Sequence, residues 1–196
     1  MASHDGQPQI RLTWADMVAK YVLVDRDGVL NADRPDSVRT PAELRLLPRA
    51  GRAVAQLNAL GYRVVVVTNQ ACVGRGDLSE EMLEHIHDVL RRRIAAQGGA
   101  IERIYVCPHL PEVRCDCRKP APGLLLKARR DLDLDLSATW FVGDSERDLL
   151  AAAAAGCRPA LVRTGKGART KPSRAVPIFR DLLSFADYLG ECDTPS

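Results

Sequence analysis

The sequence predicts an α/β protein with a three-layer, Rossmann-like parallel sheet and helices on both of its faces. Short apolar runs rich in β-branched residues alternate with segments of helical periodicity along the chain. One run, at 63–67, contains four consecutive valines, which is typical of a strand buried on both faces of a parallel sheet. Polar residues follow the ends of several of these runs, where ligands bind in such sheets.

Each predicted strand is a short apolar run, and each predicted helix carries apolar residues three or four positions apart. Glycines directly after several helical segments are typical helix stops, and Ser79 is a typical N-cap residue. The strands are predicted at 20–25, 63–67, 101–106, 139–142 and 159–162. The helices are predicted at 48–60, 79–97, 124–131, 146–155 and 178–189.

Three loops connect these elements. Residues 31–41 are rich in Asp, Arg, Ser and Pro, 107–122 contain four prolines, and 163–174 are basic and contain glycine. No connection is long enough for a large cap domain. We therefore expect one domain over 20–190, preceded by an N-terminal extension over 1–19.

The composition is ordinary for a soluble globular protein, with 46% apolar and 27% charged residues in a chain of 196. No apolar run has the length of a membrane span, and residues 1–8 lack the apolar core of a signal peptide. We expect a cytoplasmic monomer that does not bind membranes. The net charge of +3 is compatible with a small anionic substrate.

Two carboxylates stand at the end of the first predicted strand. Asp25 and Asp27 are two residues apart, so their side chains can point to the same side, and Gly28 allows a sharp turn after them. Like charges directed at one point repel, and a bound cation would offset that repulsion. A solvated acidic turn is the alternative, and this motif alone does not decide between the two.

Three further groups follow later strands. Thr68–Asn69 offers a hydroxyl and backbone N–H groups to an anion, although an ordinary strand-ending turn would look the same. Arg118–Lys119 places two cations before a predicted helix, although such pairs are often only solvated surface charges. Asp144 ends the fourth strand, and Asp148 lies one helical turn further on, where it could simply stabilise the helix dipole.

A cysteine and histidine cluster lies in the proline-rich loop. Three thiols and one imidazole fit a structural zinc ion, because four protein ligands leave no position open for a catalytic water. We expect this zinc ion to staple the loop, and reduced cysteines without metal are the alternative. The expected ligands are Cys107, His109, Cys115 and Cys117. The remaining thiols, without such partners, are Cys72, Cys157 and Cys192.

Taken together and in this order, the motifs resemble those of the haloacid dehalogenase-like phosphohydrolases. The resemblance covers roughly residues 20–165 and is more specific than any single motif. It implies a phosphoric monoester hydrolase that forms an aspartyl-phosphate. The motifs that carry it are Asp25-x-Asp27-Gly28, Thr68-Asn69, Lys119 and Gly143-Asp144-x-x-x-Asp148.

The resemblance implies a role for each of five residues. Asp25 would be the nucleophile, and Asp27 the general acid and base that carries a proton. Catalytic Mg²⁺ would be held by Asp25, the backbone carbonyl of Asp27, and Asp144. Thr68 and Lys119 would stabilise the phosphoryl group during transfer.

The zinc loop narrows the implied substrate. The motif at 117–123 resembles phosphatases that act on heptose bisphosphates in lipopolysaccharide biosynthesis, whereas the short spacing inside the zinc loop resembles histidinol-phosphate phosphatases. Asn69 and Arg118 are the expected substrate-binding residues. A guanidinium binds a second phosphate in a bidentate manner, which suits a bisphosphate better than cationic histidinol phosphate.

A zinc-containing nucleic-acid-binding module is a remote alternative. Its basic segments would be Arg91–Arg93 and 163–174. The triple arginine lies late in a helix, where the dipole favours cations, and aromatic residues for base stacking make up only 5% of the chain. We therefore expect no nucleic-acid partner.

Overall fold

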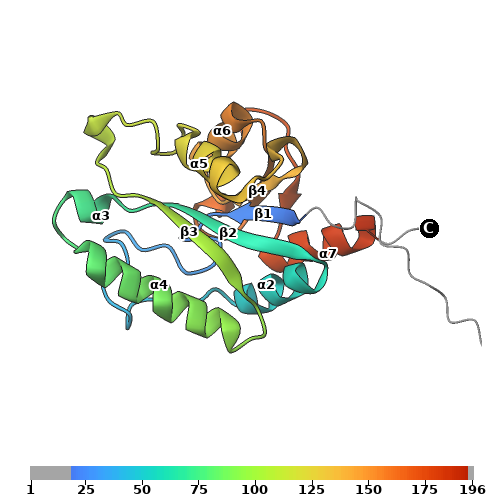
Figure 1. The fold of residues 1–196 in the computed structure, drawn as a ribbon, viewed down its shortest axis with the longest axis horizontal. Coiled ribbons are helices and arrows are strands. Elements are labelled where there is room, and N and C mark those ends of the chain that lie inside the picture. Colours follow the sequence, from blue (N-terminus) through green and yellow to red (C-terminus); the bar gives the residue numbers. More distant parts are fainter. Residues whose placement is uncertain (1–18, 194–196) are drawn as a thin grey trace, which may run out of the picture.

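A computed structural model describes residues 19–193, which form one sheet of six parallel strands in the order β3-β2-β1-β4-β5-β6 (Figure 1). The predicted parallel α/β fold is thus confirmed. The extension predicted over 1–19 lies outside the described residues except for Ala19. The strands are β1 Lys20–Val24, β2 Tyr62–Asn69, β3 Ile101–Cys107, β4 Trp140–Gly143, β5 Arg158–Val162 and β6 Ile178–Phe179.

Helices cover both faces of the sheet (Figure 1). One apolar core joins the sheet to α2, α4 and α7, and a second joins the opposite face to α5 and α6. None of the helices in the described part of the chain is long and apolar enough to cross a membrane. The helices are α2 Ala50–Ala59, α3 Ala71–Gly74, α4 Glu80–Ala95, α5 Gly123–Leu132, α6 Glu146–Ala155 and α7 Leu182–Asp193, with short 3-10 turns η1 Pro111–Val113, η2 Leu136–Ala138 and η3 Gly165–Ala168.

The valine-rich strand is buried on both faces, as the sequence predicts. Val64 and Val66 belong to the core under α2 and α4, whereas Val65 and Val67 belong to the core under α5. Successive side chains alternate across a strand, so a continuous apolar run fits only a strand that is covered on both sides. This strand runs further than predicted, and Thr68–Asn69 lies within it.

The end of the chain differs from the prediction of one helix over 178–189. Residues 178–179 form the edge strand β6, in which Phe179 pairs with Val162 of β5. The helix begins only at Leu182, because Asp181 Oδ1 accepts the backbone N–H of Ser184 at 2.9 Å and caps its first turn. A two-residue strand is too short to show periodicity. The one-turn helix α3 escaped prediction for the same reason.

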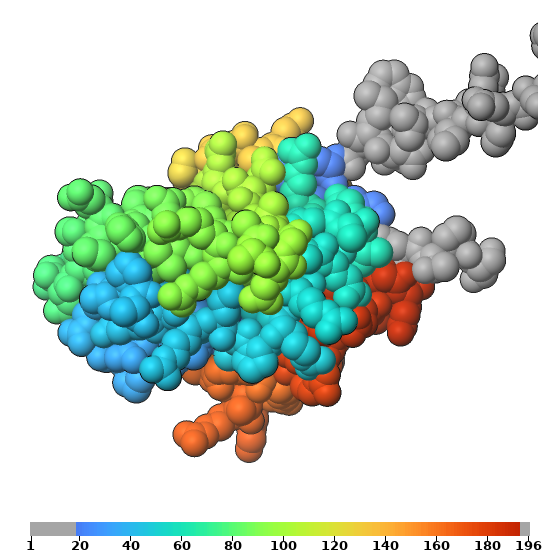
Figure 2. All heavy atoms as spheres, turned by 90° about the horizontal axis from the view of Figure 1, so that it is seen from below, coloured from blue at the N-terminus to red at the C-terminus, as the bar shows by residue number. Residues whose placement is uncertain are grey.

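The strand order reverses beside β1, which has β2 on one side and β4 on the other. The Asp25 N–H continues the ladder beyond β1 with a 2.9 Å hydrogen bond to Val142 of β4. The loop at 31–41 lies against α4, whose Arg93 donates to the carbonyls of Pro41 and Leu44, and Figure 2 shows these two segments (blue and green) side by side. The crevice beyond β1, β2 and β4 is where the predicted site residues meet.

Candidate active site and metal sites

Three carboxylates and one ammonium group meet beyond the ends of β1 and β4. One oxygen from each of Asp25, Asp144 and Asp148 lies within 4.8 Å of the others. Lys119 Nζ lies 2.8 Å from Asp25 Oδ1 and 2.7 Å from Asp148 Oδ1, and it donates to the Val67 carbonyl at 2.9 Å. The Lys119 side chain is only 2% exposed, so it reaches the site from within the protein.

Two glycines allow the chain to cross next to Asp144. Gly28 has φ +84°, and a Cβ there would lie 1.9 Å from Asp144 Oδ2. A Cβ on Gly165 would lie 2.2 Å from the same oxygen and 2.5 Å from the Gly28 Cα. The two turns are tied together by the Thr164 hydroxyl, which donates to the Gly28 carbonyl at 2.6 Å. Side chains at these positions would displace Asp144 from the site.

The carboxylates are electrostatically crowded. Burial raises the pKa of Asp25 to about 7, and neighbouring Asp148 and Asp27 add to that rise while Lys119 opposes it. Burial also raises the pKa of Asp144 to about 6, with a further contribution from Asp148. Although burial lowers the pKa of Lys119, Asp148 and Asp25 hold it above its ordinary value. The site therefore favours an additional positive charge.

The donor atoms suit a hard divalent cation such as Mg²⁺. The hydrogen bonds among the described residues reach Asp25 at Oδ1, from Arg26 N and Lys119, and Asp144 at Oδ2, from Lys166 N at 2.8 Å. The second oxygen of each carboxylate is thus left for a ligand bond. Carboxylate and carbonyl oxygens are the ligands that Mg²⁺ prefers.

Asp27 lies in a different environment from the other acids. Its Oδ1 accepts from Arg26 Nη2 at 3.0 Å and from Asn31 Nδ2 at 2.8 Å, and its Oδ2 accepts from Arg26 Nη2 at 2.9 Å and from Gln70 Nε2 at 2.8 Å. Burial raises its pKa, but Arg26 and the hydrogen bonds outweigh burial, so the pKa lies below its ordinary value. In this arrangement Asp27 is an ionised acceptor, and its expected role as a proton donor stays a prediction.

Three other predicted residues line the same cavity. Thr68 is buried at the end of β2, and its Oγ1 accepts from Gln70 Nε2 at 2.8 Å. Asn69 makes two 3.1 Å hydrogen bonds with the backbone N–H and C=O of Lys119, so its amide holds that segment in place. Arg118 donates to the His109 carbonyl at 3.2 Å. The expected contacts of Asn69 and Arg118 with substrate stay predictions.

The cavity has an acidic floor and a basic rim, and its volume is about 270 Å³. Lys166 forms a 2.8 Å ion pair with Asp33 across the cavity edge. Most of this rim was not predicted from the sequence, although the basic loop at 163–174 and the Asp- and Arg-rich loop at 31–41 were available as signals. The rim cations are Arg34, Arg75, Arg118, Arg147 and Lys166.

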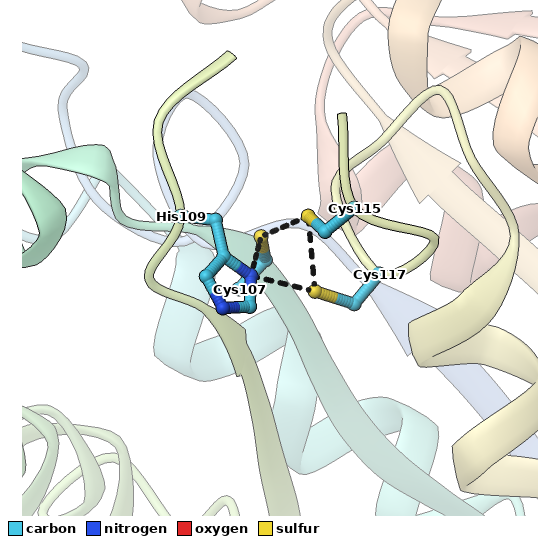
Figure 3. A group of neighbouring side chains, drawn as sticks. All are labelled: Cys107, His109, Cys115 and Cys117. Atoms are coloured by element: carbon cyan, nitrogen blue, oxygen red, sulfur yellow. Dashed lines mark hydrogen bonds between the residues drawn. The ribbon is translucent and has the colours of Figure 1, made fainter. Parts of the chain in front are cut away.

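The four predicted zinc ligands converge in one cluster (Figure 3). The Cys107 Sγ lies 3.7 Å from both His109 Nδ1 and Cys115 Sγ, and Cys117 Sγ lies 3.2 Å from His109 Nδ1 and 3.3 Å from Cys115 Sγ. Tetrahedral zinc with sulfur ligands spaces those sulfurs about 3.8 Å apart, so the cluster needs little expansion to hold the ion. The cysteines are free thiols.

The cysteine and histidine cluster is directly connected to the cavity that Asp25 and Lys119 line. Cys107 ends β3, and Cys117 precedes Arg118 and Lys119 in the chain. The Gly123 N–H donates to the Asp116 carbonyl at 2.9 Å, which fixes the loop between the cluster and α5. A structural ion here would therefore hold Lys119 in position without touching substrate.

The site lies at the switch point of a parallel sheet. It combines an aspartate after the first strand, a second aspartate after β4 and a buried lysine between acids, which is typical of hydrolases that transfer a phosphoryl group. The HAD-hydrolase-like family model matches residues 116–185. Together with the relatives described next, this match shows that the chain belongs to the haloacid dehalogenase-like hydrolases.

The relatives have one activity in their names. A D-glycero-β-D-manno-heptose-1,7-bisphosphate 7-phosphatase of Pseudomonas aeruginosa is 44% identical over 176 residues, which cover 88% of this chain and 99% of the relative. The enzyme of the same name from Bordetella bronchiseptica is 41% identical over 174 residues, covering 87% and 97%. The crystal structure of D,D-heptose 1,7-bisphosphate phosphatase from B. bronchiseptica, complexed with magnesium and phosphate, matches with a TM-score of 0.84 at 40% identity, covering 88% of this chain and 98% of that one.

Proposed function

We propose that the protein is a Mg²⁺-dependent phosphatase that removes the 7-phosphate of D-glycero-β-D-manno-heptose 1,7-bisphosphate through an aspartyl-phosphate. The observation that carries this proposal is the pairing of Asp25 with Lys119, 2.8 Å apart, beside Asp144 on the floor of a cavity with a basic rim. The names of the relatives supply the substrate and its anomer.

The first half-reaction transfers the phosphoryl group to Asp25. Asp25, the Asp27 carbonyl and Asp144 would hold Mg²⁺, which when bound neutralises and aligns the transferring phosphate. The Lys119 ammonium already touches the nucleophile, so it can contact the phosphoryl oxygens while keeping Asp25 ionised. The Thr68 hydroxyl lines the same cavity and would contact another phosphoryl oxygen.

Asp27 would move protons in both half-reactions. It donates to the departing sugar oxygen, and it then takes a proton from the water that hydrolyses the aspartyl-phosphate. Its hydrogen bonds to Arg26, Asn31 and Gln70 favour the ionised form needed for the second role. For the first role, an incoming phosphate anion raises the pKa of a neighbouring carboxylate and can itself bring the proton.

The basic rim favours a bisphosphate over histidinol phosphate. Five cations line the cavity, and three of them, Arg34, Arg75 and Lys166, form ion pairs with carboxylates. Arg118, which precedes Lys119 in the chain, instead donates to the His109 carbonyl. A second phosphate would be attracted by this rim, whereas the ammonium group of histidinol phosphate would be repelled. The substrate is thus a small anionic sugar phosphate.

The test is phosphate release from heptose 1,7-bisphosphate and from histidinol phosphate by the purified, Mg²⁺-loaded protein. We expect a higher kcat/KM on the bisphosphate, with activity abolished in Asp25→Asn and retained in the control Asp88→Asn on the exposed side of α4. A higher kcat/KM on histidinol phosphate would mean that histidinol phosphate, and not the bisphosphate, is the substrate. Undiminished turnover by Asp25→Asn would overturn the mechanism.

We further propose that the protein acts as a cytoplasmic monomer with zinc in the cysteine cluster. Reduced thiols gathered around a histidine suit a reducing compartment and a metal better than disulfides. Size-exclusion chromatography with light scattering checks the oligomeric state, and elemental analysis of the purified protein checks for one equivalent of zinc.

A further inference from the structure

A fully buried arginine stands between the two acids of the first motif. The Arg26 side chain is 0% exposed, which is costly for a permanent charge unless its donors are paired. Its Nη2 donates to both carboxylate oxygens of Asp27, and its Nη1 lies 3.2 Å from Nε2 of His87 in α4, whereas its Nε has no hydrogen-bond partner among the described residues. The guanidinium therefore joins a site residue to a helix 61 residues further along the chain.

His87 is neutral and accepts from Arg26. Burial, Arg26 and Arg91 lower the pKa of His87 to about 3, against a smaller opposing effect of Asp27. Because a guanidinium only donates, Nε2 must be the acceptor and Nδ1 carries the proton. Nδ1 lies 3.5 Å from Glu84 Oε1 but makes no hydrogen bond within the described part of the chain, so the tautomer follows from the Arg26 contact. A neutral acceptor pairs one N–H of Arg26 without competing with Asp27 for its charge.

We infer that Arg26, supported by His87, is a positioning residue that fixes the direction of the Asp27 carboxylate. Each oxygen of that carboxylate accepts from Arg26 and from one further amide, Asn31 or Gln70. Without His87, Nη1 would lose its partner and the guanidinium could rotate away from Asp27. The inference rests on the proposed function, in which Asp27 serves the leaving group.

We expect the loss of kcat/KM caused by misalignment of Asp27 to depend on the leaving group. A sugar alkoxide needs a proton as it departs, whereas 4-nitrophenolate leaves without one. The ratio kcat/KM reports the steps up to departure of that group. A loss of Asp27 alignment should therefore lower kcat/KM on heptose bisphosphate much more than on 4-nitrophenyl phosphate. A merely structural defect would lower both alike.

The test compares three variants of α4 in the Mg²⁺-loaded protein. His87→Leu removes the acceptor, His87→Gln restores one, and His85→Leu makes the same exchange at an exposed position of the helix. We expect His87→Leu to lose on the order of 10–100-fold in kcat/KM on the sugar and less than about threefold on 4-nitrophenyl phosphate, a part of the usual general-acid contribution. His87→Gln should recover most of the loss, and His85→Leu should match the wild type.

A double-mutant cycle keeps the inference falsifiable if His87→Leu is unstable. In an Asp27→Asn background, either His87 exchange should cause no further leaving-group-dependent loss, because both act through one carboxylate. Equal losses on both substrates, or no recovery with His87→Gln, would overturn the inference while leaving the proposed function intact. A wild-type protein inactive on heptose bisphosphate would instead overturn the proposed function.

Discussion

Removing the charge of Asp148 should lower the free energy of unfolding, and the contacts of its side chain indicate by how much. Its side chain is 1% exposed, lies 2.7 Å from Lys119 Nζ, and accepts from the Ser145 N–H at 3.0 Å and from the Ser145 hydroxyl at 2.6 Å. Asp148→Asn keeps an oxygen for the helix cap but removes the charge. Removing one partner of a buried ion pair costs about 3–5 kcal/mol. Because Lys119 keeps Asp25 and the Val67 carbonyl, we expect about 2–3 kcal/mol instead.

Asp148→Ala removes the cap as well, which adds about 1 kcal/mol. The assay is urea unfolding followed by circular dichroism, with zinc retained and Mg²⁺ absent. For a chain of this size, the Asn variant should unfold about 4–12 °C below the wild type in a thermal scan. Asp88→Asn is the matched control, because Asp88 forms an exposed 3.0 Å ion pair with Arg91 that contributes little to stability.

Two outcomes would refute this reasoning. If Asp148→Asn unfolds within about 0.5 kcal/mol of the Asp88→Asn control, the pair with Lys119 contributes no more than a surface ion pair. If Asp148→Ala is no less stable than Asp148→Asn, the helix cap contributes nothing. The first result would mean that Asp148 is not a stabilising partner of Lys119, and the second that it does not stabilise the N-terminus of α6.

Three further predictions concern the carboxylates of the candidate active site, the cysteine cluster and Arg118. Burial raises the pKa of Asp25 to about 7 and of Asp144 to about 6 from 3.8, so the folded metal-free protein binds more protons than the unfolded chain in that window. Its free energy of unfolding should therefore fall as pH rises from about 4 to 7. Differential scanning fluorimetry should show that Mg²⁺ raises Tm more at pH 8 than at pH 5, and an equal increase in Tm at the two pH values would contradict this. Cys115→Ser should lose zinc, measured by elemental analysis, and should have a lower Tm, measured by calorimetry. Cys192→Ser, at an exposed position, should keep both the zinc content and the Tm of the wild type. Arg118→Ala should raise KM for the bisphosphate about 10-fold or more while changing KM for a monophosphate little. Equal increases in the two KM values would mean that Arg118 does not recognise the second phosphate.

The main elements of the fold follow from local patterns in the sequence. The valine run predicts a strand covered on both faces, and the structure has it as β2. Ser79 was expected to cap the helix after it, and its side chain accepts from Met82 N there. In contrast, β6 forms because Phe179 pairs with β5 and packs on the core. A segment of two residues is too short for periodicity to predict it.

The candidate site was predictable where the chemistry lies at strand ends. Asp25, Thr68 and Asp144 line one cavity because parallel strands end at the same edge of the sheet. Arg26 and His87 were not found, because nothing local distinguishes a buried pair formed across 61 residues from solvated charges. One signal was available, since His87 interrupts the buried stripe of α4 made by Leu83, Ile86, Leu90 and Ile94.

The central claim is that Asp25 accepts the phosphoryl group. The most direct measurement is rapid acid quenching of the Mg²⁺-loaded protein during turnover of heptose 1,7-bisphosphate, followed by mass spectrometry of the peptide that contains residue 25. The mechanism predicts a phosphoryl group on Asp25 that appears before free phosphate and is absent from the Asp25→Asn variant. Steady phosphate release with unmodified Asp25 at every quench time would contradict it.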